Sequence, residues 1–305
     1  MRIVFMGTPD FAVKSLEALA EAHEVVLVVT RPDAVRGRGK RLEPSAVKAA
    51  AQKRGLSVLE AKRVDERILD AVRAAQADVI CVAAYGAILP DAIFDCARLG
   101  CINVHASLLP RWRGAAPIQR AVLEGDERAG ISIMRITHEL DAGAYCKQAS
   151  LEIGDMPCQE LMEKLGELGG QALVEALGEL DQGTAVWHEQ DESQVSFAPK
   201  ITKEEMRLDP ADSAEKNKRR VQASLDAAPA RFALAGKGVR ALEATLVDKS
   251  LRAGEVEVSD GHIYLGCKDG ALELLRVKPD GKKEMLAHAW AQGLHAQQLS
   301  WSKLS

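Results

Sequence analysis

The stretch Cys101–Pro110, "CINVHASLLP", combines residue types that could catalyse an acyl transfer. Asn103 and His105 are two positions apart at the end of an apolar run, and because side chains alternate along a strand they point to the same face. An Asn amide is an uncharged hydrogen-bond donor, and an imidazole can donate or accept a proton near neutral pH. Together they could stabilise a developing oxyanion and move one proton, as acyl transfer requires.

A carboxylate that could orient this imidazole follows the next predicted strand, "GISIMRI" (130–136). The chain leaves that strand through "LDAG", so we expect Asp141 to lie at the same edge of the sheet as His105. A nearby carboxylate favours the charged form of an imidazole and fixes its orientation. Asp before Ala-Gly is also a common turn residue, so the pattern alone leaves a purely structural role open.

The first 150 residues alternate between short apolar runs and helical patterns. Near-continuous apolar runs such as "EVVLVVT" (24–30) and "ADVICVAA" (77–84) are typical of parallel strands covered on both faces. Strands alternating with helices indicate βαβ units, and such sheets bind ligands at the carboxyl ends of their strands. We therefore predict an α/β fold with a Rossmann-like, open and mostly parallel sheet.

The pattern changes after residue 205. Asp-Gly pairs at 260–261, 269–270 and 280–281 separate or follow short alternating runs, which is a strong hairpin signal. We predict a small, OB-like, antiparallel β-barrel there. The expected organisation is an α/β domain over 1–188, a polar and irregular linker over 189–205, and the barrel domain over 206–305.

Charge is unevenly distributed along the chain. The net charge of −4 argues against a general polyanion binder, yet residues 200–305 hold 18 Lys and Arg against 15 Asp and Glu. Residues 31–41 form a cationic loop that contains Arg31, Arg36, Arg38, Lys40 and Arg41. Such a loop on an acidic domain suggests one specific anionic partner, although a merely solvated loop is the alternative.

Several classes of protein are not indicated. The start of the sequence goes directly into a folded-looking pattern and no apolar run reaches about eighteen residues, so we expect neither a signal peptide nor a membrane segment. The six Cys are scattered without a C-x-x-C pair, which fits a reducing cytoplasm. The turn "GTPDF" (7–11) lacks the glycine spacing of a dinucleotide or P-loop motif, and the other His residues form no metal-ligand spacing. We expect no NAD, ATP or metal.

Six segments in chain order resemble the methionyl-tRNA formyltransferases, a family of folate-dependent formyltransferases. The segments are "GTPDF" (7–11), "RGRGKRLEPSAVK" (36–48), "AAYGAILP" (83–90), "NVHASLLPRWRGAAPIQRAV" (103–122), "LDAG" (140–143) and "FAPKIT" (197–202). The Asn-x-His-x-Ser-Leu-Leu-Pro block marks the wider formyltransferase group. The basic loop and the barrel-like tail narrow the resemblance to the tRNA enzymes.

The resemblance implies a reaction and a set of site residues. The formyl donor would be 10-formyltetrahydrofolate, and the acceptor the α-amino group of methionine on initiator tRNA, giving N-formylmethionyl-tRNA for translation initiation. Asn103, His105 and Asp141 match the catalytic residues. The implied folate-binding residues are Tyr85, Gly86, Ile88, Ser107, Leu108, Leu109 and Pro110. The implied tRNA-binding residues are Arg36, Arg38, Lys40 and Arg41.

The resemblance also implies that 1–188 is the catalytic domain and 206–305 a tRNA-binding domain, in a cytoplasmic monomer. The chain departs from the family pattern in three places. Glu139 stands where a small residue is usual, after an unusual Thr137 and His138, and Pro210 stands where an aromatic is common. The segment 227–234 lacks an expected Asn-Pro and Trp. Formyltransferases that act on nucleotide-sugar amines or glycinamide ribonucleotide, and formylfolate hydrolases, share the catalytic block. A non-catalytic RNA-binding module is a further alternative.

Overall fold

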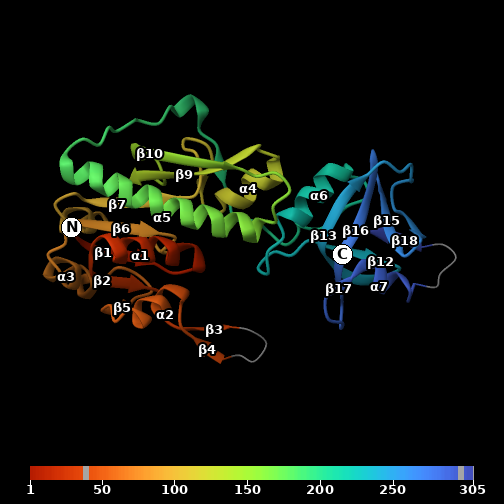
Figure 1. Ribbon diagram of the computed structural model, residues 1–305, viewed down its shortest axis with the longest axis horizontal. Coiled ribbons are helices and arrows are strands. Elements are labelled where there is room, and N and C mark those ends of the chain that lie inside the picture. The colour runs from red at the N-terminus through yellow and green to blue at the C-terminus, as the bar shows by residue number, and fades with distance from the viewer. Residues whose placement is uncertain (37–40, 295–298, 305) are drawn as a thin grey trace. The chain divides into compact units, whose positions relative to one another are not determined.

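The computed structural model describes residues 1–36, 41–294 and 299–304, and the chain is drawn in Figure 1. Its contacts divide it into two units. The first contains Met1–Pro117, Arg128–Glu152 and Met162–Ala198, and the second contains Ile118–Glu127, Ile153–Leu161 and Pro199–Ser305. The candidate catalytic residues all lie in the first unit.

A seven-stranded sheet forms the centre of the first unit, in the order β10-β9-β7-β6-β1-β2-β5. The strands are β1 (Arg2–Gly7), β2 (Glu24–Thr30), β5 (Val58–Glu60), β6 (Val79–Ala83), β7 (Cys101–His105), β9 (Arg128–Arg135) and β10 (Tyr145–Glu152). The pairings from β5 to β7 are parallel, whereas β9 and β10 run antiparallel to their neighbours. The predicted Rossmann-like, mostly parallel sheet is confirmed.

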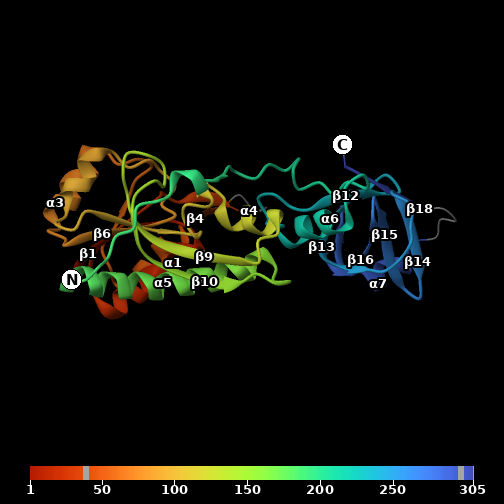
Figure 2. The same ribbon diagram turned by 90° about the horizontal axis from the view of Figure 1, so that it is seen from above.

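Helices cover both faces of this sheet, with α1 and α5 on one side and α3 on the other (Figure 2). The helices outside the barrel region are α1 (Asp10–Ala22), α2 (Ala46–Lys53), α3 (Glu66–Ala74), α4 (Pro117–Glu124) and α5 (Cys158–Gln182), with short 3₁₀ turns η1 (Asp91–Cys96) and η2 (Glu192–Gln194). The glycines inside α5 do not break it. A Cβ on Gly170 would lie 2.9 Å from the Lys14 carbonyl oxygen, so this glycine lets α5 pack closely on α1.

Two short strand pairs flank the main sheet. β3 (Ala34–Arg36) and β4 (Arg41–Glu43) form an antiparallel hairpin. β8 (Arg113–Gly114) pairs in parallel with β11 (Phe197–Ala198). Through the β8–β11 pair, part of the polar, irregular segment that follows α5 lies beside the loop after β7.

The second unit contains a closed antiparallel barrel, as the sequence predicts. The order β13-β12-β18-β14-β15-β16 is closed into a ring by pairing of β13 with β16. Its elements are α6 (Ala214–Gln222), β12 (Arg231–Leu234), β13 (Lys237–Val247), β14 (Glu255–Ser259), β15 (His262–Cys267), β16 (Gly270–Pro279), β17 (Met285–Leu286), α7 (Ala287–Ala291) and β18 (Leu299–Ser302). The hairpins predicted at Asp260-Gly261 and Asp269-Gly270 are confirmed.

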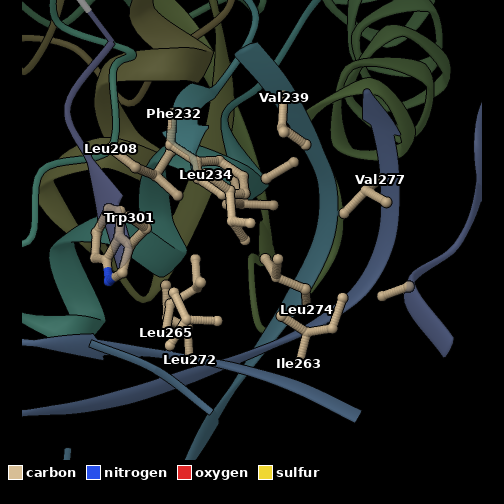
Figure 3. Packing of buried hydrophobic residues seen from close by; sticks show 14 of the residues in the cluster. Leu208, Phe232, Leu234, Val239, Ile263, Leu265, Leu272, Leu274, Val277 and Trp301 are labelled. Atoms are coloured by element: carbon tan, nitrogen blue, oxygen red, sulfur yellow. The ribbon is translucent and has the colours of Figure 1, made fainter. Parts of the chain in front are cut away.

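The interior of the barrel is filled by aliphatic and aromatic side chains (Figure 3). Phe232 and Trp301 meet edge to face with ring centroids 6.0 Å apart, a favourable geometry for two aromatic rings. The indole nitrogen of Trp301 donates to the Gly266 carbonyl oxygen at 2.8 Å, so its one polar atom is satisfied inside the core.

Candidate active site

His105 is the last residue of β7, at the carboxyl end of the parallel strands, and its side chain is only 5% exposed. Asn103 is half-buried two residues earlier on the same strand and is in register with Val82 of β6. Both residues therefore lie where open α/β sheets bind their ligands.

The structure brings Asp141 to His105, but by a route that differs from the expected one. Asp141 Oδ2 lies 3.5 Å from His105 Nδ1. The prediction that Asp141 lies at the same edge of the sheet as His105 is confirmed, but β9 is antiparallel to β7, so Arg135 at its end pairs with Ile102 near the start of β7. The loop after β9 must return along β7 to deliver the carboxylate.

The imidazole of His105 is held from two sides. Nε2 lies 3.0 Å from the backbone oxygen of Trp112, and because a carbonyl can only accept, Nε2 donates this hydrogen bond. Nδ1 faces the Asp141 carboxylate, which also accepts from the Gly114 backbone N–H at 2.9 Å. With an acceptor beside each ring nitrogen, the orientation of the imidazole ring is fixed from both sides.

Both neighbours of the imidazole have an unusual backbone. Trp112 has φ +66° and Asp141 has φ +50°, in the left-handed region that non-glycine residues seldom adopt. Asp tolerates this region better than a bulky residue does, so Trp112 is the more strained of the two. Strained residues persist where the surrounding structure over-determines them, and they concentrate at functional sites.

The segment Ser107–Pro110 is fixed by polar side chains, of which Ser107 and Ser132 are buried. Ser107 Oγ donates to the Arg111 carbonyl oxygen at 2.6 Å. Ser132 Oγ, on β9, donates to the Ser107 carbonyl at 2.7 Å and accepts from the Leu109 N–H at 3.0 Å. Gln148 Nε2, on β10, donates to the Leu109 carbonyl oxygen and to Ser132 Oγ, both at 2.9 Å. Sequence reasoning missed Ser132 and Gln148, because one polar residue within a strand pattern carries no signal of its partners.

Replacement of Ser132 by alanine is expected to destabilise this segment. Ser132 is fully buried, so its loss leaves the Leu109 N–H and the Ser107 carbonyl without their partner, at a cost of about 1–3 kcal/mol. Thermal unfolding followed by circular dichroism measures the effect. Ser150→Ala, on the neighbouring strand β10, is the control, and an equal change in both variants would contradict the role of Ser132.

The second predicted folate-binding segment follows β6. Tyr85 is buried and its hydroxyl donates to the Ala61 carbonyl oxygen at 3.2 Å, so its side chain belongs to the core and only its backbone lies in the loop. The Gly86 carbonyl oxygen accepts from Arg31 Nη1 at 2.6 Å. Ile88 is 93% exposed, which leaves an apolar side chain open to a ligand.

The predicted cationic loop coincides with the β3–β4 hairpin. Arg36 and Arg41 are register partners, and Arg41 is exposed. Arg38 and Lys40 lie outside the described residues. Val35 and Leu42 are also register partners and are 62% and 68% exposed, so the hairpin presents apolar as well as cationic side chains.

Cysteine chemistry is not favoured at this site. Burial raises the pKa of Cys101, which begins β7, to about 12, so its thiolate is scarcely populated near neutral pH. Burial also raises the pKa of Cys146 and Cys267 to about 11.

Among the described residues there is no group of His, Cys, Asp and Glu able to hold a metal ion. No helix within residues 1–36, 41–294 and 299–304 is long and apolar enough to cross a membrane.

Comparisons with known proteins agree with this architecture. Residues 1–177 match the family described as formyl transferase, and residues 200–295 match the formyl transferase C-terminal domain. Methionyl-tRNA formyltransferase of Methylobacterium nodulans is 43% identical over 301 residues, which cover 96% of each chain.

Solved structures share the fold at lower identity. Methionyl-tRNA formyltransferase from Clostridium thermocellum has a TM-score of 0.55 at 15% identity and covers 81% of this chain and 94% of its own. HypX from Aquifex aeolicus, in complex with tetrahydrofolic acid, has a TM-score of 0.65 at 17% identity over 95% of this chain and 46% of its own.

Proposed function

The chain belongs to the formyl transferase family, and on this premise we propose that it transfers the formyl group of 10-formyltetrahydrofolate to the α-amino group of methionyl initiator tRNA. The observation that carries the chemistry is the buried His105 imidazole held between Asp141 and the Trp112 carbonyl, with Asn103 on the same strand face. The 43% identical methionyl-tRNA formyltransferase supports the choice of acceptor.

In the proposed reaction the amine adds to the formyl carbon, and the folate nitrogen then leaves. The α-amino pKa is roughly 7.7–8.0 in a free terminus and an ester lowers it, so a neutral amine is present without a strong base. The amine forms a new C–N bond, and negative charge develops on the formyl oxygen. We propose that the Asn103 amide donates to this oxyanion and that the Nε2–H of His105, which bonds the Trp112 carbonyl in this structure, is shared with it.

Collapse of the tetrahedral intermediate breaks the bond to N10 of the folate. The attacking nitrogen loses one proton and N10 gains one, with His105 or a water carrying it between them. Asp141 keeps the imidazole oriented throughout. The residues Ser107–Pro110 and the loop of Gly86 and Ile88 are proposed to bind the folate.

In this proposal each part of the chain has a different role. Residues 1–188 would carry catalysis, 189–205 link the parts, and 206–305 contact the tRNA together with Arg36, Arg38, Lys40 and Arg41. Because charged initiator tRNA is used where translation starts, we expect the enzyme to act in the cytoplasm. A monomeric state remains a prediction.

A competition among acceptors tests the function. The enzyme is given 10-formyltetrahydrofolate with methionyl initiator tRNA, glycinamide ribonucleotide, a nucleotide-sugar amine, or water alone. We expect rapid formylation of the tRNA and slow or no transfer to the others. Transfer to a small amine without transfer to the tRNA would contradict the proposal.

The double variant Arg38→Ala/Arg41→Ala is expected to raise the KM for tRNA roughly tenfold, equivalent to about 1.4 kcal/mol, because it removes two of the cations proposed to bind tRNA phosphates. The KM for the formyl donor should stay unchanged. The dependence of KM on salt should also weaken, since fewer counterions are released. Arg63→Ala, an exposed arginine after β5, is the control. If the double variant had the same KM for tRNA as the parent, Arg38 and Arg41 would not contribute to tRNA binding.

A further inference from the structure

The side chain of Gln190, in the irregular segment that follows α5, holds the loop that carries Asp141. Its Nε2 donates to the backbone oxygens of Asp141 and Gly143, both at 2.8 Å. Gln190 is only 9% exposed, so these hydrogen bonds are sheltered from water. They fix the backbone on both sides of Ala142, next to a residue with positive φ.

Gly143 fixes the same loop from the other side. A Cβ at this position would lie 2.0 Å from the Arg135 carbonyl oxygen, so the loop passes directly against the end of β9. Only a glycine allows this approach. The path of the Asp141 loop is therefore set between β9 and Gln190.

Arg113 fixes the orientation of the Gln190 amide. Its side chain is 5% exposed, and its Nε donates to Gln190 Oε1 at 2.9 Å. Its Nη2 donates to Glu192 Oε1 at 2.7 Å, which balances the guanidinium charge. Because the guanidinium occupies the amide oxygen, the amide NH₂ group must face the two carbonyl oxygens of the Asp141 loop.

Ser196, in the same segment, holds the other neighbour of the imidazole. Its Oγ accepts from the Trp112 backbone N–H at 3.0 Å, and its carbonyl accepts from the Arg113 N–H at 2.9 Å. The Trp112 carbonyl is the acceptor for His105 Nε2. The guanidinium of Arg111 also lies over the Trp112 ring, 4.4 Å from its centre.

We propose that Gln190–Ser196 acts as a clasp that sets the geometry of His105, with Gln190 as its main positioning residue. One end of the clasp holds Asp141 beside Nδ1, and the other holds Trp112 beside Nε2. The clasp acts through these two residues and is not itself in contact with the imidazole. This inference rests on the proposed function only where it concerns turnover.

The substitution Gln190→Glu tests the clasp by removing the two N–H donors at nearly constant size. The new carboxylate can still pair with Arg113, which preserves the fold around it. We expect kcat to fall about 10–100-fold, because small misplacements of a catalytic group cost about that much, while both KM values change less than about threefold. Gln182→Glu is the matched control, since Gln182 is an exposed residue at the end of α5, outside the clasp.

An NMR measurement tests the positioning of His105 independently of which reaction the enzyme catalyses. In ¹⁵N-histidine-labelled enzyme without substrates, the Nδ1 proton of His105 is assigned by its loss in His105→Ala. We expect a protected signal in the parent and in Gln182→Glu, and its loss or rapid exchange in Gln190→Glu. This measurement gives an answer even if the enzyme transfers no formyl group.

Two results would overturn the clasp: an unchanged His105 signal in Gln190→Glu, or a kcat within about threefold of the parent. Ser196→Ala is the second variant in case Gln190→Glu does not fold, as judged by thermal unfolding. It frees the Trp112 N–H, and we expect a roughly tenfold lower kcat with a shifted Nε2 resonance. Parent-like kinetics and spectrum in a folded Ser196→Ala would likewise count against the clasp.

Discussion

Replacement of His105 by alanine is expected to lower kcat by a factor of about 10²–10⁴, the scale on which acid–base and oxyanion-stabilising groups contribute. The imidazole is buried at the end of β7, so no neighbouring side chain or bulk water can take its place with the same geometry. Its Nε2–H is one of the two donors proposed to stabilise the formyl oxygen. Single-turnover formylation of methionyl-tRNA at saturating donor measures this step directly.

The control for this variant is His138→Ala. His138 lies in the loop that carries Asp141, but its side chain is 87% exposed and its Nδ1 is 3.3 Å from Asp91 on the surface. We expect near-normal turnover from this control. A His105→Ala enzyme that turned over at the parent rate would remove His105 from the mechanism.

Replacement of Asp141 by asparagine is expected to lower kcat by a similar factor, about 10²–10⁴. Asparagine has nearly the same size and its oxygen can still accept from the Gly114 N–H, so the fold should survive. The negative charge beside Nδ1 is lost, however, and a neutral amide orients the imidazole less firmly than a carboxylate does. The expected result is a folded protein with normal substrate binding and slow turnover.

Equilibrium binding of a folate analogue and thermal unfolding, measured beside kcat, test this second prediction. Asp91→Asn, a surface carboxylate 71% exposed, gives the matched control. If Asp141→Asn instead kept its kcat and lost substrate affinity, Asp141 would be a binding residue and the proposed orienting role would be wrong.

Much of the fold follows from local patterns. Continuous apolar runs mark β2 and β6 because both faces of a parallel sheet are covered. The Asp-Gly pair at Asp260-Gly261 marks the turn from β14 to β15 because this dipeptide accepts positive φ. The alternation of side chains along a strand likewise predicts that Asn103 and His105 share one face of β7.

Other features could not be predicted because they depend on contacts distant in sequence. The burial pattern of "GISIMRI" fits either direction, so only the structure shows that β9 is antiparallel to β7. Gln190 and Ser196 lie in an irregular polar segment, where side chains that bond distant backbone groups leave no periodic signal. The sequence therefore indicates which residues could do the chemistry, but not which residues hold them in place.

The most direct test of the proposed function compares initiator and elongator methionyl-tRNA as acceptors of the formyl group from 10-formyltetrahydrofolate. Both carry the same methionyl amine, so the chemistry at the reacting atoms is identical and only the tRNA differs. We predict efficient formylation of the initiator, with kcat/KM at least roughly 100-fold above that for the elongator, equivalent to about 2.7 kcal/mol of differential transition-state binding. Absence of formyl transfer to the initiator tRNA by a folded enzyme that formylates a small amine would contradict the account.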